Sequence, residues 1–366
     1  LFKPGPILTL TSSYFVAKYL FLFKEYALLD AIIKSKIMQI NSKKFLILIT
    51  RKIPDTIERK LEENFSIIKN KNDKKYSYRD LKKKIGDVDI LIPCISDTID
   101  ASIIKAGKKL KLIANFGNGV DNLDLTTAKE NNVMVTNTPD VLTEDTADVV
   151  LTMILMICRK IITAQKRIIK GEWNGWGPSE TLGERISGKK VGIIGMGRIG
   201  SAVAKRLSVL GIKINYHNRN RVSKIIEKKY NAKYWANLED MLSNVDLLSI
   251  HCPYTPETFH LLSKKRLKLL KKNCVVINTS RGEIVDEESL ADLLLEKKIG
   301  GAGLDVFEHE PQITQKLFES ENVVLLPHIS SATKQSRVAM GERVLKNILY
   351  YVKGKRCPDL IDKSKE

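Results

Sequence analysis

The chain has 366 residues, 43% of them hydrophobic, and a formal net charge of +19 at pH 7. This length and composition predict a globular protein of two ordinary-sized domains and exclude a disordered chain. The basic residues are spread along the whole sequence and form no cluster interleaved with aromatic residues. We therefore interpret them as a solvated surface whose field favours anionic ligands, and we predict neither a nucleic-acid nor a membrane partner. A nucleic-acid binder is an alternative that rests on net charge alone.

Cysteine usage bears on the compartment and on metal binding. The five cysteines are an odd number without a CxxC pair, which argues against a disulfide framework and against a zinc ribbon. We expect a reducing, cytoplasmic environment and no metal ion in the functional site.

The first 37 residues differ from the rest of the chain. The stretch 7–33 is apolar, but Lys18, Lys24, Glu25 and Asp30 interrupt it, so no run approaches the roughly 20 residues that span a bilayer. It also lacks the compact apolar region and the cleavage site of a signal peptide. Because the first methionine is Met38, we predict that residues 1–37 are an extension outside the fold.

From residue 44 onward, short apolar runs alternate with amphipathic segments in two series. This pattern predicts an α/β protein with parallel sheets covered by helices. A long helix is expected over 143–170 between the two series, and a last helix over 332–353 should pack back on the first series. The first domain would then comprise 38–141 and 329–366, and the second 142–328. The expected strands are 45–50, 88–93, 111–116 and 133–136, then 189–195, 211–217, 245–251, 274–280, 300–307 and 322–328, with a further helix over 54–64.

The sequence GMGRIG places Gly195, Gly197 and Gly200 in the GxGxxG spacing of dinucleotide-binding turns. The first glycine permits a tight turn, the second lets the backbone approach a pyrophosphate, and the third lets the helix pack closely on the strand. The motif is weak by itself, because an ordinary glycine-rich turn has the same letters. Here it follows the apolar strand VGII and precedes apolar residues at helical spacing, which favours a nucleotide site.

About twenty residues later, YHNRNR (216–221) ends the next expected strand without the Asp or Glu that usually binds the adenosine ribose. An acid here would repel a 2′-phosphate, whereas Asn218, Arg219 and Asn220 can bind one. We therefore predict NADP(H) as the preferred cofactor, with NAD(H) possible. The alternative is an exposed basic turn without a ligand.

Polar residues also follow three expected strands of the second series, at the edge where ligands of parallel sheets bind. They include Arg281, Glu310 and His328. His328 alone could be a capping or core histidine. Together with an arginine and an acid on neighbouring strand ends, it indicates catalysis.

From about residue 43 to 354, the chain resembles the D-isomer-specific 2-hydroxyacid dehydrogenases, and within them most closely the glyoxylate and hydroxypyruvate reductases. Several motifs in family order carry this resemblance: NFGNGVDNLD (115–124), VTNTPDVLTEDTAD (135–148), GKKVGIIGMGRIG (188–200), HCPYTPETFHLL (251–262), INTSRGEIVDE (277–287), GLDVFEHEP (303–311) and NVVLLPHISSAT (322–333). The resemblance implies a Rossmann-type cofactor domain, a flavodoxin-like substrate domain and a cleft between them.

The resemblance also implies catalytic roles. Arg281 would bind the substrate carboxylate and polarise the adjacent carbonyl. His328 would be the general acid in reduction, and Glu310 would orient it and favour its protonated form. Backbone N–H groups of Asn118 and Gly119 would add carboxylate donors from the other domain, and Ile95 and Ser96 would line the pocket.

For the cofactor, the resemblance implicates a wider set of residues. Asp305 would hydrogen-bond the nicotinamide carboxamide. Thr279 and Ser280 would lie beside the ribose and nicotinamide, and Cys252 and Pro253 near the adenosine. The remaining implied contacts are Arg198 and Ile199 at the helix start, together with Arg281 and His328.

The reaction expected from this resemblance is NADPH-dependent reduction of glyoxylate to glycolate and of hydroxypyruvate to D-glycerate, in a homodimer. One alternative is 3-phosphoglycerate dehydrogenase or another D-2-hydroxyacid dehydrogenase. Another is a dinucleotide-sensing binding protein like the related corepressors. The sequence does not rank small 2-oxo acids, because one methylene in a pocket contributes only about 1–3 kcal/mol.

Overall fold

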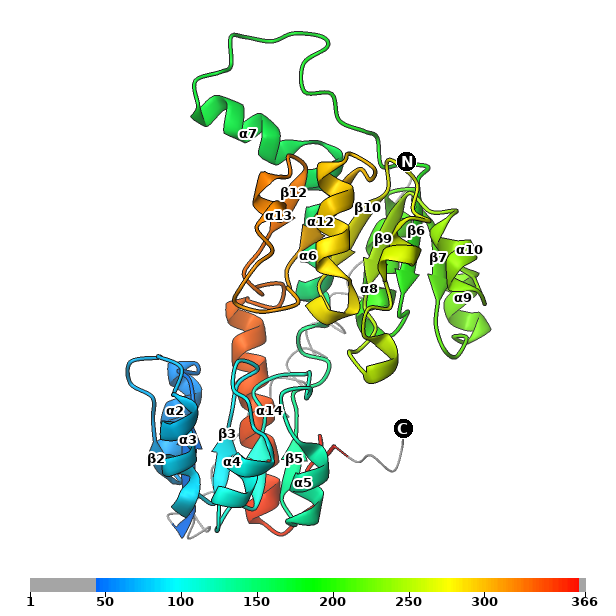
Figure 1. Ribbon diagram of the computed structural model, residues 1–366. Coiled ribbons are helices and arrows are strands. Elements are labelled where there is room, and N and C mark those ends of the chain that lie inside the picture. Colours follow the sequence, from blue (N-terminus) through cyan, green and yellow to red (C-terminus); the bar gives the residue numbers. More distant parts are fainter. Residues whose placement is uncertain (1–43, 362–366) are drawn as a thin grey trace, which may run out of the picture.

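The computed structural model describes residues 44–361 of the chain, so the predicted extension, 1–37, lies outside the described residues. Within them, two parallel sheets lie at opposite ends of the molecule (Figure 1). This arrangement confirms the predicted class, an α/β protein with two parallel-sheet domains. The domain boundaries at residues 142 and 329 stay a prediction.

The first sheet has five strands in the order β2-β1-β3-β4-β5. Its central strands are buried on both faces, as apolar runs without alternation predict. The strands are β1 (Leu46–Ile49), β2 (Ser66–Ile68), β3 (Ile90–Ile92), β4 (Leu112–Ala114) and β5 (Met134–Thr136). The helical segments that connect them are α2 (Asp55–Glu62), α3 (Tyr78–Lys84), η2 (Ile85–Asp87), α4 (Ala101–Ala106) and α5 (Leu125–Glu130).

The second sheet has seven strands in the order β12-β11-β10-β9-β6-β7-β8. Its strands are β6 (Lys190–Ile194), β7 (Lys213–His217), β8 (Lys233–Tyr234), β9 (Leu247–Ile250), β10 (Val275–Asn278), β11 (Gly301–Leu304) and β12 (Val323–Leu325). The helical segments between them are α8 (Arg198–Val209), α9 (Lys224–Tyr230), α10 (Leu238–Leu242), η3 (Pro256–Thr258), α11 (Lys264–Leu267), η4 (Gly282–Ile284), α12 (Glu287–Leu295) and α13 (Lys316–Glu319).

Two helices mark the crossings of the chain between the sheets. Helix α6 (Thr143–Cys158) buries Met153 and Ile157 in the core of the seven-stranded sheet. Helix α14 (Lys334–Val352) runs back along the five-stranded sheet, as the sequence predicts, and buries Val344 and Ile348 there (Figure 1). The five-stranded domain therefore combines two segments that lie far apart in the chain.

The predicted single helix over 143–170 is wrong. The structure has two helices, because Lys160 adopts a left-handed conformation (φ 51°) between α6 and α7 (Ile161–Ile169). The Cys158 carbonyl accepts a hydrogen bond from the Glu184 N–H instead of continuing the helix. Two short strands, β2 and β8, lie at sheet edges and were not predicted, because their half-exposed residues give no apolar run.

The order of the strands fixes where ligands can bind. In the first sheet, β2 lies on one side of β1 and β3 on the other. In the second sheet, β7 lies on one side of β6 and β9 on the other. Crevices form at such switch points, beyond the carboxyl ends of the strands. The loops at the two switch points carry residues that were predicted as ligand contacts, among them Ser96 after β3 and Gly197 after β6. Among residues 44–361, no helix is both long and apolar enough to cross a membrane.

Candidate active site

Glu310 and His328 come together beyond the ends of β11 and β12. Oε2 of Glu310 lies 3.0 Å from Nδ1 of His328, and Oε1 accepts the Phe307 N–H at 3.1 Å. Burial alone raises the pKa of Glu310, but the hydrogen bond and charge of His328 outweigh it and hold that pKa below its ordinary value. The carboxylate is therefore ionised at neutral pH and can orient the imidazole.

The backbone around His328 is held in an unusual conformation by Asp305. His328 has a φ of 56°, in the left-handed region that non-glycine residues rarely adopt. Asp305 is fully buried, and its two oxygens accept the N–H groups of Ile329 and Ser330 at 2.7 Å each. The structure thus gives Asp305 a task that the sequence analysis missed, since it fixes the segment that presents His328. Its predicted contact with a carboxamide stays a prediction.

Arg281 follows β10 and reaches the other domain. Its Nε and Nη2 donate to the carboxylate of Asp121, with Nη2 2.9 Å from Oδ1. Its Nη1 donates to the Ser280 carbonyl at 2.8 Å, and the Asn278 side chain holds the turn through the Arg281 carbonyl. The Asp121 contact was not foreseen, although Asp121 lies within NFGNGVDNLD.

The loop after β4 lies directly against Arg281. Asn115 and Asn137 brace this loop, because their side-chain amides donate to the carbonyls of Gly119 and Asn118 at 2.8 Å each. A Cβ on Gly119 would lie 1.8 Å from Nη2 of Arg281, so only glycine permits this approach. Neither Asn118 nor Gly119 donates its backbone N–H to an acceptor within 44–361, which leaves both donors available to a ligand.

Ser96 lies at the switch point of the five-stranded sheet. Its Oγ accepts a hydrogen bond of 3.3 Å from Nη1 of Arg51, whose Nε donates to Asp73 at 2.9 Å. Ile95, beside it, has 36% of its surface exposed. Arg51 was not predicted as a site residue, although its position directly after the first strand was the signal that could have found it.

The glycine-rich turn after β6 has the shape that a dinucleotide requires. Gly195 has a φ of 92°, and a Cβ there would lie 2.5 Å from the Cys252 nitrogen. A Cβ on Gly197 would meet nothing within 4 Å, so space is left beside the backbone for a pyrophosphate. The Oγ1 of Thr279 is buried without a hydrogen-bond partner among the described residues. These features fit the predicted cofactor.

Further predicted cofactor residues lie around this turn. Arg198, at the start of α8, contacts Asp140 with 2.8 Å between Nη1 and Oδ1. Ser280 donates its hydroxyl to the Cys252 carbonyl, which joins the loops after β9 and β10. Ile199 is half-buried on the first turn of α8, and Pro253 is exposed in the loop after β9.

Of the polar residues that follow β7, two make internal contacts and two are exposed to solvent without such contacts. Asn218 accepts the Met196 N–H through Oδ1 at 2.6 Å, which joins it to the glycine-rich turn and leaves its NH₂ group to donate. Arg221 is held by Glu227 through two hydrogen bonds of 2.7 and 2.9 Å. Arg219 and Asn220 are exposed, and neither forms a hydrogen bond or ion pair within 44–361. The predicted phosphate ligands are thus accessible.

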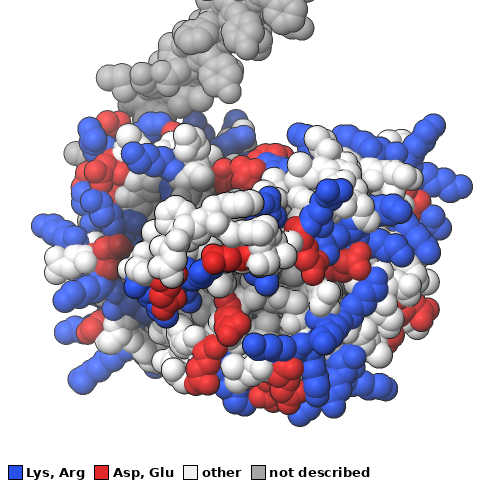
Figure 2. Space-filling view, turned by 90° about the horizontal axis from the view of Figure 1, so that it is seen from above, with Lys and Arg blue, Asp and Glu red and all other residues white. Residues whose placement is uncertain are grey.

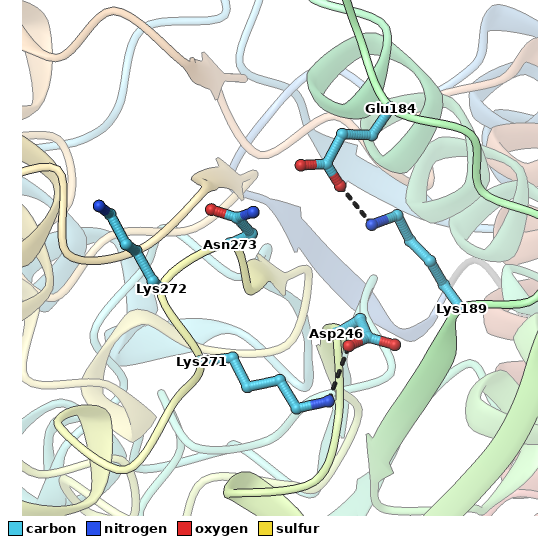
Figure 3. Close-up of a pocket in the computed structure, with 6 residues that line it drawn as sticks. All are labelled: Glu184, Lys189, Asp246, Lys271, Lys272 and Asn273. Atoms are coloured by element: carbon cyan, nitrogen blue, oxygen red, sulfur yellow. Dashed lines mark hydrogen bonds and ion pairs between the residues drawn. The ribbon is translucent and has the colours of Figure 1, made fainter.

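A separate pocket lies at the opposite edge of the seven-stranded sheet. Figure 3 shows Lys189 turned toward Glu184, and Lys271 turned toward Asp246 with 2.8 Å between Nζ and Oδ1. These residues precede or begin β6, β9 and β10, so they lie at the amino ends of the strands. Ligands of such sheets bind at the carboxyl ends. We therefore do not assign the functional site to this pocket.

The surface charge is distributed rather than concentrated. In the view of Figure 2, lysine and arginine side chains project all around the outline of the molecule, and acidic side chains lie among them. This face does not carry a single basic stripe of the kind that tracks a nucleic-acid backbone. The distribution agrees with a solvated basic surface.

Comparison with known proteins decides the family. Residues 151–330 match the model of the D-isomer specific 2-hydroxyacid dehydrogenase NAD binding domain. The glyoxylate reductase of Thermococcus litoralis is 41% identical over 321 residues, which cover 87% of this chain and 96% of that protein. The chain belongs to the D-isomer-specific 2-hydroxyacid dehydrogenase family. The resemblance inferred from the motifs is confirmed, and membership makes the chain an NAD(P)-dependent dehydrogenase that acts on 2-oxo acids.

Other relatives and solved structures of this family are similar over nearly the whole described chain. The glyoxylate reductase of Pyrococcus horikoshii is 39% identical over 87% of this chain and 96% of its own length. An NADPH-dependent glyoxylate/hydroxypyruvate reductase from Sinorhizobium meliloti, solved with NADP and malonate, is 32% identical with a TM-score of 0.78, covering 87% of this chain and 96% of that one. A glyoxylate reductase from Paecilomyes thermophila is 28% identical with a TM-score of 0.78, covering 88% and 99%.

Proposed function

We propose that this dehydrogenase uses NADPH to reduce glyoxylate to glycolate and hydroxypyruvate to D-glycerate. The observations that carry the proposal are the Glu310–His328 pair and the close approach of Arg281 to the loop of Asn118 and Gly119, whose backbone N–H groups have no acceptor within residues 44–361. This set combines a proton donor with several carboxylate donors, as reduction of a 2-oxo acid requires. The glyoxylate reductases that the chain resembles support the choice of substrate.

In the proposed mechanism, the substrate carboxylate binds Arg281 and the N–H groups of Asn118 and Gly119, so that both domains hold it. Bound NADPH supplies the hydride. His328 donates a proton to the carbonyl oxygen, which becomes the hydroxyl of the product. The negative charge of Glu310 stabilises the protonated imidazole before that transfer and keeps its ring in place. In the reverse reaction, His328 accepts the same proton.

Residues around the glycine-rich turn would hold the cofactor. Gly197 would admit the pyrophosphate beside the start of α8, whose N-terminus favours anions, and Thr279 would gain a partner for its buried hydroxyl. We assign a 2′-phosphate to Arg219, Asn220 and the NH₂ group of Asn218. The absence of a carboxylate at these positions favours NADPH over NADH.

We further propose that two copies of the chain associate through α7 and the following loop. This segment projects from the rest of the molecule (Figure 1). It also exposes large apolar side chains. Ile169 is 76% exposed, Trp173 58% and Trp176 86%. Apolar side chains gathered on one exposed segment favour a protein interface. A second copy would cover them.

The direct test of the proposed reaction is steady-state oxidation of NADPH in the presence of glyoxylate, hydroxypyruvate or pyruvate. We expect turnover with the first two and a lower kcat/KM with pyruvate. Absence of turnover with both glyoxylate and hydroxypyruvate would overturn the substrate assignment. Faster turnover with 3-phosphohydroxypyruvate would favour the phosphoglycerate dehydrogenase alternative.

A further inference from the structure

The contact between Arg281 and Asp121 joins two residues that are 160 positions apart in the chain and belong to different domains. Both side chains are largely shielded, with 17% exposure for Arg281 and 28% for Asp121. Two nitrogens of the guanidinium share the carboxylate, with Nε–Oδ2 and Nη2–Oδ1 distances of 3.0 and 2.9 Å. This side-on geometry is a bidentate arginine–carboxylate contact, which is stronger and geometrically more specific than a single neutral hydrogen bond.

The donors of Arg281 can be assigned one by one. A guanidinium carries five N–H groups in a fixed plane, one on Nε and two on each terminal nitrogen. The Nε–H and one N–H of Nη2 face Asp121, and one N–H of Nη1 faces the Ser280 carbonyl. One N–H on each terminal nitrogen then has no acceptor within residues 44–361. Because Ser280 directly precedes Arg281, we assign its carbonyl to the Nη1 N–H on the Cδ side. The two remaining N–H groups then form the end of the fork, a second face that can bind a carboxylate with two hydrogen bonds.

We propose that Asp121 is a positioning residue that holds the side face of Arg281 and thereby presents the end face to the substrate carboxylate. This inference rests on the proposed function and adds to it a residue that would not touch the substrate. Without Asp121, the long arginine side chain would regain rotamer freedom, and ordering it again would weaken substrate binding. The contact would also keep the loop of Asn118 and Gly119 beside Arg281, so that donors from both domains converge.

The opposite role would be competition, in which the Asp121 carboxylate occupies the place of the substrate and must be displaced. The two roles predict effects of opposite sign. If Asp121 positions Arg281, its removal weakens the binding of a small carboxylate. If Asp121 competes, its removal strengthens that binding and lowers KM.

The test compares wild-type enzyme with Asp121→Ala and Asp121→Asn, and with Asp148→Ala as a matched control. Asp148 also accepts from an arginine Nε, that of Arg206 at 2.7 Å, but this pair joins α6 to α8 away from the site. The first measurement is the affinity of the enzyme–NADPH complex for oxalate, followed by cofactor fluorescence. Oxalate is not reduced, so this measurement stays informative even if glyoxylate is not turned over and the proposed function fails.

We expect both Asp121 variants to bind oxalate and to process glyoxylate roughly 10- to 100-fold less well, as the loss of a charged hydrogen bond implies. The NADPH affinity of both Asp121 variants should match that of the wild type. Asp148→Ala should match the wild type in oxalate affinity, glyoxylate turnover and NADPH affinity. Tighter oxalate binding in Asp121→Ala would overturn the proposal in favour of competition. Unchanged oxalate binding, or an equal loss of NADPH affinity, would also overturn it, the latter by pointing to a general structural role.

Formate provides a second readout that a merely structural role would not move. In Asp121→Ala, formate can occupy the space of the missing carboxylate and hold the side face of Arg281 again. We expect low concentrations of formate to raise the glyoxylate kcat/KM of Asp121→Ala and to inhibit the wild type. Inhibition of both proteins to the same degree would contradict the positioning role.

Discussion

Oε2 of Glu310 lies 3.0 Å from Nδ1 of His328, so the other ring nitrogen, Nε2, faces away from the carboxylate. This relationship sets the imidazole as a donor to Glu310 on one side and leaves Nε2 for the substrate oxygen. We predict that Glu310→Gln lowers kcat/KM for reduction of glyoxylate. The physical reason is that a neutral amide forms a weaker hydrogen bond with the imidazole than the carboxylate does, so it holds the ring less firmly. An unchanged kcat/KM would remove Glu310 from this role.

The lowered pKa of Glu310 also predicts a pH-dependent contribution to folding. Burial opposes the shift, and the contact with His328 outweighs burial. Because the folded-state pKa lies below the unfolded one, the stabilisation is present above the unfolded pKa and is lost as the pH falls through the folded value. Thermal unfolding should therefore distinguish wild type from Glu310→Gln at neutral pH and not in strong acid. A difference in thermal stability between the two proteins that is larger in acid than at neutral pH would contradict the predicted direction of this pH dependence.

Gly119→Ala should displace Arg281, because the new Cβ would lie 1.8 Å from Nη2. We expect kcat/KM for glyoxylate to fall by about 100-fold, as a displacement near 1 Å can cause, while NADPH affinity stays unchanged. Gly86→Ala is the matched control, since a Cβ there meets nothing within 4 Å. Equal kcat/KM values for Gly119→Ala and Gly86→Ala would show that the close approach of Gly119 to Arg281 does not affect catalysis.

Asn218→Asp should reduce the preference for NADPH. The aspartate can still accept the Met196 N–H, so the turn is kept, but its charge would repel a 2′-phosphate and its oxygen could bind the ribose of NADH. Asn231→Asp adds the same charge at an exposed position at the end of α9 and serves as the control. Equal changes in kcat/KM for NADPH and NADH in Asn218→Asp would refute the assignment.

The exposed segment after α6 should determine the oligomeric state. We expect a homodimer in sedimentation equilibrium, and a shift toward monomer when Ile168→Glu and Trp176→Asp are combined. Val209→Asp changes a residue that is 84% exposed at the end of α8 and should leave the dimer intact. A wild-type monomer would refute the interface.

Much of the fold could be predicted because apolar runs such as FLILIT and VGII dictate buried parallel strands. The missed features depend on contacts between distant segments. The break at Lys160 accompanies a hydrogen bond from the Glu184 N–H to the Cys158 carbonyl, a contact with a later segment that local propensity does not encode. Asp305 holds backbone groups 24 and 25 residues later, and Asp121 reaches Arg281 across the two domains. Motif spacing placed these acids near the site but gave no sign of their partners.

The most direct test of the account is the kcat/KM of wild type and Arg219→Ala with NADPH and with NADH, using glyoxylate at fixed, moderate ionic strength. Arg219 is exposed and forms no hydrogen bond or ion pair within residues 44–361, so its loss should remove a phosphate contact without harming the fold. We predict that the wild type prefers NADPH, and that Arg219→Ala loses about 10- to 150-fold in NADPH efficiency while its NADH efficiency hardly changes. A wild-type enzyme that prefers NADH, or equal losses with both cofactors, would contradict the account.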